Sequence, residues 1–124
     1  MNVKLLRKVA KHILAEPKRY AFGWVQQSSA VPCGTKACIA GWTILLGARL
    51  RKSFDENGQL IIPKSLWRRG FGYYSGPASK LLKINHAQAS RLFVNWPSQF
   101  DNLWGDAATA VKRIEHFIKT KGKE

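Results

Sequence analysis

Acidic residues are scarce in this chain of 124 residues. It contains 7 Asp and Glu against 21 Lys and Arg, so its formal net charge at pH 7 is +14. With so few carboxylates, the sequence offers no convincing pair for acid–base catalysis. Unbalanced positive charges repel one another and destabilise a compact state, so we expect them to meet a negatively charged macromolecule.

Cysteines are few, and long apolar runs and cofactor motifs are missing. Two cysteines do not form a disulfide framework, and we expect a reducing compartment to keep them as thiols. The longest apolar run, from Ala37 to Leu46, is too short to span a membrane. Lys8 and Lys11 interrupt the stretch where a secretory signal needs its apolar core, so the sequence predicts a cytoplasmic protein. No phosphate-binding or dinucleotide-binding glycine pattern occurs, and we expect no cofactor.

The apolar residues that are present, 45% of the chain, predict one mainly α domain over residues 1–124. From Val3 to Leu14 they recur at helical spacing on one half of a helical wheel. Asn2 is a suitable N-cap and Pro17 ends the helix at about residue 16. The opposite half of this helix carries four cations: Lys4, Arg7, Lys8 and Lys11.

A second helix is predicted from 36 to 50, with Thr35 as its N-cap. It is apolar nearly all round, which is typical of a helix at the centre of a domain, so we expect a compact fold built round it. Asn57-Gly58 lies between segments that can pair, which indicates a small β-hairpin at 53–62.

The rest of the chain predicts short elements and one long helix. A helical turn at 63–69 is followed by a glycine- and aromatic-rich loop at 70–76. Two short helices are expected at 78–84 and 86–94, the second capped by Asn85. Asp106 is the expected cap of a last helix that runs to about Thr120.

One motif in the central region is distinctive. The stretch Cys33-Gly34-Thr35-Lys36-Ala37-Cys38-Ile39-Ala40-Gly41-Trp42 resembles the core motif C-G-T-x-x-C-x-A-G-W of a functionally uncharacterised group of small bacterial and phage proteins. The resemblance continues in scattered blocks to Ile118 and includes Trp96-Pro97 and the run Arg113 to Ile118. It implies a microbial or viral protein, in a bacterial cell or a phage-infected host, and leaves the activity open. The basic stretch from Arg49 to Tyr74 departs from the group.

The positive residues form clusters along the chain. Lysine and arginine bind phosphates by neutralising charge and releasing counterions, so these clusters indicate a nucleic-acid surface. The alternative for each cluster is a solvated helix face. The residues predicted to contact nucleic acid are Lys4, Arg7, Lys8, Lys11, Lys18, Arg19, Arg51, Lys52, Arg68 and Arg69.

The stretch from Trp67 to Tyr74 combines arginines, glycines and aromatic rings. Exposed rings stack on unpaired bases, and glycines let a backbone approach closely. Phe71, Tyr73 and Tyr74 are therefore predicted stacking residues. The alternative is a loop whose rings pack into the core.

Catalytic chemistry has little support in the sequence. Cys33 or Cys38 is the candidate nucleophile, because both lie near the start of a predicted helix, where a thiolate would be stabilised. His86 or His116 would be its base. The competing interpretation is that Cys33 and Cys38 are small buried apolar residues. The spacing of these cysteines and the scattered histidines do not match a zinc site, so we expect no metal.

The sequence therefore predicts a small basic protein that binds DNA or RNA mainly through phosphates, with little base readout. An alternative is a phage-type inhibitor or adaptor that binds a host protein or a nucleoprotein complex. A third interpretation is a cysteine-dependent enzyme. No membrane partner is expected, because the apolar arc of the first helix is better explained as its seam with the rest of the domain.

Overall fold

The computed structural model describes residues 1–20, 25–27, 35–48, 54–56, 59–103 and 106–124. Within these residues the fold is mainly α, as predicted from the sequence. Its α-helices are α1 (Val3–Ala15), α2 (Ile39–Gly47), α3 (Ser75–Leu82), α4 (His86–Phe93) and α5 (Ala107–Lys119). Its strands are β1 (Val25–Gln27) and β2 (Thr35–Ala37), and its 3₁₀ turns are η1 (Pro17–Arg19), η2 (Lys64–Leu66) and η3 (Ser98–Leu103).

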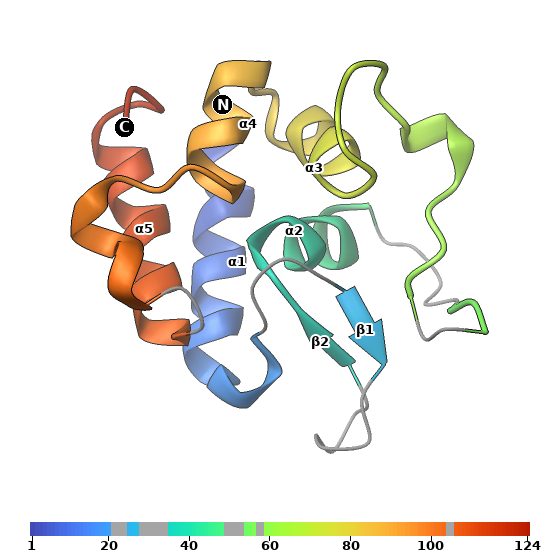
Figure 1. Cartoon of the computed structure of the whole chain (residues 1–124), viewed down its shortest axis with the longest axis horizontal. Coiled ribbons are helices and arrows are strands. Elements are labelled where there is room, and N and C mark those ends of the chain that lie inside the picture. The colour runs from blue at the N-terminus through green and yellow to red at the C-terminus, as the bar shows by residue number, and fades with distance from the viewer. Residues whose placement is uncertain (21–24, 28–34, 49–53, 57–58, 104–105) are drawn as a thin grey trace.

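Helix α1 packs against both α5 and α2, and α2 also packs against α3. Figure 1 shows α1 alongside α5, and α2 lying between α1 and α3. Residues 39–45 of α2 are all buried, so the predicted central apolar helix is confirmed. Among the residues that the structure describes, no helix is both long and apolar enough to cross a membrane.

Helix α1 has the ends and the inner face that its sequence predicts. The Asn2 side chain accepts a hydrogen bond from the Leu5 N–H at 3.1 Å, and the helix ends just before Pro17. Leu6, Val9 and Ile13 are fully buried. Leu14, also expected on the apolar face, is instead 63% exposed.

The predicted start of the central helix at Thr35 is wrong. Thr35 pairs with Gln27 in the antiparallel β1–β2 sheet, so its backbone is extended. Cys38 is the N-cap instead, and its Sγ accepts a hydrogen bond from the Gly41 N–H at 3.4 Å. The helix ends at Gly47, where a Cβ atom would come within 2.8 Å of Leu5. This close approach joins α1 to α2.

In the described part of the predicted hairpin at 53–62, Phe54 and Leu60 form an antiparallel bridge. Asp55 N–H donates to the Gln59 carbonyl at 2.9 Å, and the Asp55 carboxylate accepts from the Gln59 N–H at 3.0 Å. The expected Asn57-Gly58 turn lies outside the described residues.

Two of the other predicted caps are present. The Asn85 side chain accepts from the Gln88 N–H while the Gln88 side chain accepts from the Asn85 N–H, which forms a complete capping box at the start of α4. The Asp106 carboxylate caps α5 by accepting from the Ala108 N–H at 2.8 Å. Helix α3 begins at Ser75, three residues earlier than expected.

Candidate nucleic-acid interface

The four predicted cations of α1 lie together on its outer surface. We call this set the α1 basic face: Lys4, Arg7, Lys8 and Lys11. All four are exposed because the buried apolar residues occupy the other side of the helix. Among the described residues, the ion pairs are Arg19 with Glu16 and His116 with Glu124. The positive charge of the α1 basic face is therefore not neutralised by a carboxylate in the described part of the chain.

A shallow hollow of about 470 Å³ lies beside the α1 basic face. Lys4, Lys8 and Lys11 line it together with Leu46 and Gly47 from the end of α2. Because cations line its wall, a phosphate group that enters this hollow would meet several positive charges. The predicted contacts Arg51 and Lys52 follow α2 in sequence but lie outside the described residues.

The start of α1 is joined to the end of α3. The Asn2 N–H donates to the Leu82 carbonyl at 2.7 Å, and the Asn2 side chain donates to the Leu81 carbonyl at 3.4 Å. Lys80 and Lys83, both exposed, flank these carbonyls in sequence. Lys80 Nζ donates to the Ser65 carbonyl at 3.1 Å, and both lysines line a hollow with Trp67, so they lie toward η2.

Arg19 does not belong to this surface, which corrects the sequence prediction. It is 8% exposed, and its guanidinium carbon lies 4.9 Å from the centre of the Trp42 ring. Trp42 Nε1 also donates to the Arg19 carbonyl at 3.2 Å. Arg19 therefore anchors η1 to α2, whereas the neighbouring Lys18 stays exposed.

The stretch from Trp67 to Tyr74, here the 67–74 segment, is held against α3 by its own arginine. Arg68 Nη1 donates to Ser79 Oγ at 3.0 Å and to the Ile84 carbonyl at 2.9 Å. Its guanidinium carbon also lies 4.3 Å from the centre of the Phe71 ring. Arg68 is thus largely committed to the fold, whereas Arg69 is exposed.

Two of the three predicted stacking rings are covered. Phe71 is half-buried beneath Arg68, and its ring centre is 5.0 Å from that of His86. The hydroxyl of half-buried Tyr74 donates to Gln59 Oε1 at 2.7 Å. Burial, with smaller contributions from Tyr73, Cys38 and Asp55, raises the pKa of Tyr74 to about 12. For these two residues the structure favours packing over base stacking.

Trp67 and Tyr73 are the exposed rings of the 67–74 segment, with 50% and 45% of their surfaces accessible. Trp67 Nε1 donates to the Ile62 carbonyl at 3.0 Å. The Tyr73 hydroxyl accepts from the Ile62 N–H at 2.9 Å and donates to the Leu60 carbonyl at 3.3 Å. Because the polar atoms of both rings are bonded to the backbone, the rings are held in place with apolar surface open to solvent.

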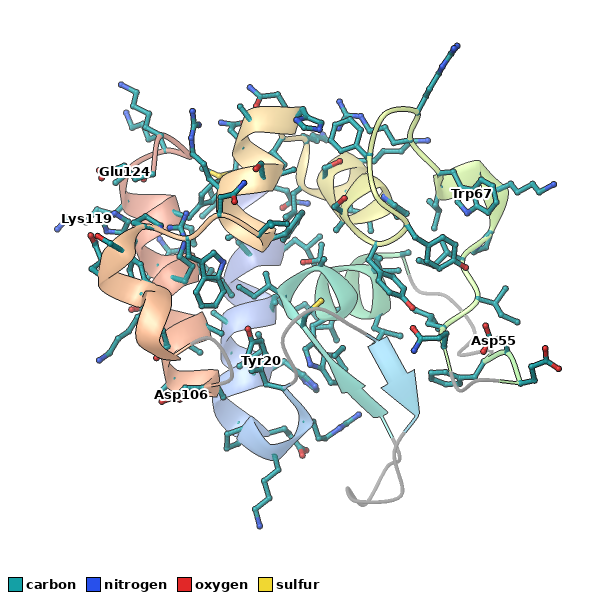
Figure 2. All side chains as sticks on the ribbon, in the orientation of Figure 1. Tyr20, Asp55, Trp67, Asp106, Lys119 and Glu124 are labelled. Atoms are coloured by element: carbon teal, nitrogen blue, oxygen red, sulfur yellow. The ribbon has the colours of Figure 1, made fainter. Side chains whose placement is uncertain are left out.

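Trp67 lies between two hollows at the edge of the molecule, on the side away from α5 (Figure 2). The hollow of about 460 Å³ is bordered by Arg69 and Tyr73, and that of about 530 Å³ by Lys80 and Lys83. The sequence prediction did not choose Trp67 for stacking. Its position beside Arg68 and Arg69 was the available signal, but ring exposure depends on contacts with Ile62 that sequence spacing does not show.

The structure describes some of the residues considered for cysteine or metal chemistry. Cys38 is buried and caps α2, while Cys33 lies outside the described residues, so a pairing of Cys33 with His86 has no described geometry. His86 itself is exposed at the start of α4. Within the described ranges, no three histidine, cysteine or acidic side chains are grouped so that they could hold a metal ion.

No protein-family model, curated protein or solved structure matches this chain. The resemblance to the group with the C-G-T-x-x-C-x-A-G-W motif therefore stays a prediction.

Proposed function

We propose that this protein binds nucleic acid, with the α1 basic face as its main contact to phosphates. The single observation that carries the proposal is the exposure of Lys4, Arg7, Lys8 and Lys11 on one helix face, with no carboxylate partner in the described residues. Such a face gains free energy by releasing the counterions that surround a polyanion. Lysines and arginines that grip phosphates carry no sequence information, so little base readout is expected.

The 67–74 segment adds a second, aromatic contact to the proposal. Trp67 and Tyr73 offer rings that are already fixed by hydrogen bonds, and Lys64 Nζ lies 5.9 Å from the centre of the Trp67 ring. Unpaired bases stack on such rings while neighbouring cations follow the backbone. We therefore expect single-stranded DNA or RNA to bind more tightly than a duplex.

Salt dependence tests the proposal most directly. Fluorescence anisotropy would follow labelled single-stranded DNA, RNA and duplex DNA at salt concentrations from about 50 mM to about 200 mM. If each cation of the α1 basic face neutralises one phosphate, log K for duplex DNA falls with log salt with a slope of about −4. Absence of binding to all three oligonucleotides at the lowest salt concentration would overturn the proposal.

A bacterial or phage-infected cytoplasm is the proposed place of action, in keeping with the resemblance of Cys33 to Trp42 to small bacterial and phage proteins. Nucleic acid that co-purifies from a bacterial host, and is removed by nuclease, would support this assignment. Host proteins that remain bound after nuclease treatment would favour the adaptor alternative instead.

A further inference from the structure

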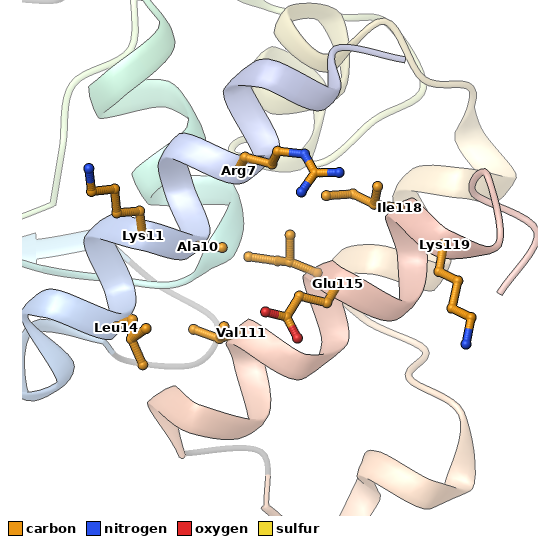
Figure 3. A pocket seen from close by; sticks show the side chains of 9 residues that line it. Arg7, Ala10, Lys11, Leu14, Val111, Glu115, Ile118 and Lys119 are labelled. Atoms are coloured by element: carbon orange, nitrogen blue, oxygen red, sulfur yellow. The ribbon is translucent and has the colours of Figure 1, made fainter.

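Helices α1 and α5 form a groove whose apolar floor lies outside the proposed nucleic-acid interface. The two helices lie side by side and antiparallel, so that Leu14 is opposite Val111 and Arg7 is opposite Ile118 (Figure 3). The residues that line this α1–α5 groove recur three and four positions apart on each helix, so its walls follow both helix axes. Its volume is about 400 Å³.

The floor of the α1–α5 groove is apolar and partly open to solvent. Val111 and Ile114 are buried at its base, whereas Ala10 and Ile118 are half-buried and Leu14 is 63% exposed. Leu14, Ala10 and Ile118 together leave a narrow apolar strip open to solvent between polar side chains. The rim here is polar and mostly cationic.

Three cations border the floor: Arg7 and Lys11 on α1 and Lys119 on α5. Glu115 is the one carboxylate among the lining residues. Two helices with an outward apolar seam and charged edges match the geometry in which proteins hold an amphipathic helix. Each of these helices has 13 residues and is about 20 Å long, enough for about four turns of a partner.

We propose that the α1–α5 groove binds an amphipathic helix from an acidic partner protein. Apolar side chains spaced three and four residues apart would enter the floor beside Leu14 and Ile118, and flanking carboxylates would face Arg7, Lys11 and Lys119. The floor residues Leu14, Val111 and Ile118 take no part in the proposed nucleic-acid binding, whereas Arg7 and Lys11 belong to both surfaces.

Charge and chemistry select this occupant over two others. A second copy of the chain would bring another rim of cations against the first, and each copy carries a net charge of +14. A nucleic acid would place its phosphates over an aliphatic floor that cannot donate a hydrogen bond. An acidic amphipathic helix satisfies both the floor and the rim.

Glu115 provides a test of whether the partner helix is acidic. Its carboxylate stands on the α5 wall between Val111 and Lys119 (Figure 3), where it repels an acidic residue of the bound helix. The Glu115→Gln variant removes this repulsion and should bind an acidic helix about 2-fold to 3-fold more tightly. The Lys119→Gln variant removes an attraction on the same wall and should weaken binding by a similar factor.

The probe is a designed peptide of about 16 residues, enough for about four turns, with leucines at one helical stripe and glutamates elsewhere. Amide chemical shifts of the ¹⁵N-labelled protein would be recorded up to about 1 mM peptide, which detects affinities too weak for most assays. We expect shifts concentrated at Leu14, Val111 and Ile118. A peptide of the same composition with its leucines distributed round the helix is the matched control.

Three variants separate this site from the nucleic-acid interface. Leu14→Asp places a like charge in the path of the acidic peptide and should weaken peptide binding at least about 10-fold. Because residue 14 lies one turn from Lys11, oligonucleotide binding is tested with Leu14→Asn, which adds no charge and should leave it unchanged. Leu14 is exposed, so both of these variants should fold. Lys8→Glu should have the reverse effect, because Lys8 lines the hollow beside α2 and not the α1–α5 groove.

Four outcomes would overturn the proposal. These are equal binding of both peptides, no shift in the groove at the highest peptide concentration, loss of oligonucleotide binding in Leu14→Asn, and a dimer that Leu14→Asp converts to a monomer. The last two would assign the groove to nucleic acid or to a second copy. Failure of oligonucleotides to bind would count against the nucleic-acid function alone.

Discussion

The α1 basic face and the 67–74 segment are both rich in cations, yet the fold uses their side chains differently. All four cations of the α1 basic face point away from a buried apolar seam and have no carboxylate partner in the described residues. In the 67–74 segment, Arg68 is bonded to Ser79 and to the Ile84 carbonyl, and Phe71 lies beneath it. A cationic residue in the sequence is therefore not always available to a ligand in the fold.

The difference has a physical origin. A helix with one apolar face directs its other face to solvent, so the charges of α1 are exposed by the helical period itself. A loop has no such period, and its backbone and side chains must find hydrogen-bond partners among neighbouring elements. Arg68 supplies two of those bonds, one to Ser79 in α3 and one to the carbonyl of Ile84, two residues beyond the helix. It therefore contributes to stability before it can contribute to binding.

Loss of Arg68 should produce the largest effect and would test whether this arginine is structural. The Arg68→Ala variant leaves the Ile84 carbonyl and Ser79 without this donor, and exposes Phe71. Hydrogen bonds from a charged group are the stronger kind, so we expect the free energy of unfolding to fall by about 3 kcal/mol, measured by urea denaturation. Arg69→Ala, at an exposed position, should change it by less than about 0.5 kcal/mol. Similar losses in both variants would show that the two arginines do not differ.

Charge reversal on α1 should give the next largest effect, on affinity and not on stability. The double variant Lys4→Glu with Lys8→Glu should bind an oligonucleotide about 30-fold more weakly at low salt. The magnitude of its salt slope should fall by about 2, as expected when two phosphate contacts are lost. Fluorescence anisotropy at several salt concentrations measures both quantities.

The matched control for this charge reversal is Lys121→Glu with Lys123→Glu, which makes the same change in net charge at the exposed end of the chain. If binding depends on the α1 basic face, the control should lose only a small part of the affinity. Equal losses in the two double variants would mean that overall charge, and no particular surface, attracts the nucleic acid.

Local rules predicted much of the fold. Asn2, Asn85 and Asp106 cap the helices that they were expected to cap, because a cap depends on residues within one turn. Thr35 failed as a cap because it pairs with Gln27, and strand pairing joins segments that local spacing does not relate. The exposed face of α1 was also predictable, because it depends on the spacing of residues within one helix.

The side chains of the candidate site were less predictable where burial depends on distant contacts. Arginine is a residue type that often binds phosphate, so Arg19 was a reasonable prediction. Trp42, 23 residues further along the chain, instead donates a hydrogen bond to its carbonyl and lies against its guanidinium group. Phe71 is covered by Arg68 while Trp67 stays exposed, although both belong to the same aromatic stretch. The spacing of apolar residues indicates which side of a helix or strand is buried. It does not show which side chains a neighbouring element covers.

Substitution of Trp67 compares the exposed and covered rings of the 67–74 segment. Trp67→Leu should weaken single-stranded binding about 10-fold, which corresponds to the loss of one stacked base, and leave duplex binding unchanged. Trp67→Phe should restore most of the affinity because it keeps an aromatic face. Phe71→Leu should lower stability without changing affinity, and a larger loss of affinity in Phe71→Leu than in Trp67→Leu would contradict the assignment.

Tyr74 should produce the smallest effect, visible only in alkaline solution. Its pKa is raised from 10.0 to about 12, first by burial and then by the neighbouring Tyr73, Cys38 and Asp55. Between these two values its phenol ionises in the unfolded chain but stays protonated in the folded protein. The stability that Tyr74 contributes is therefore fully present below pH 10.0 and is lost as the pH rises toward about 12.

The Tyr74→Phe variant should flatten this part of the pH dependence. Urea denaturation from about pH 9 to about pH 12 would show a shallower decline than in the unmodified protein. Burial also raises the pKa of Tyr20, but Tyr20 is present in both proteins and its contribution cancels in the comparison. Identical declines in the two proteins would mean that Tyr74 is as accessible as Tyr73, and that the 67–74 segment does not hold its rings in two different environments.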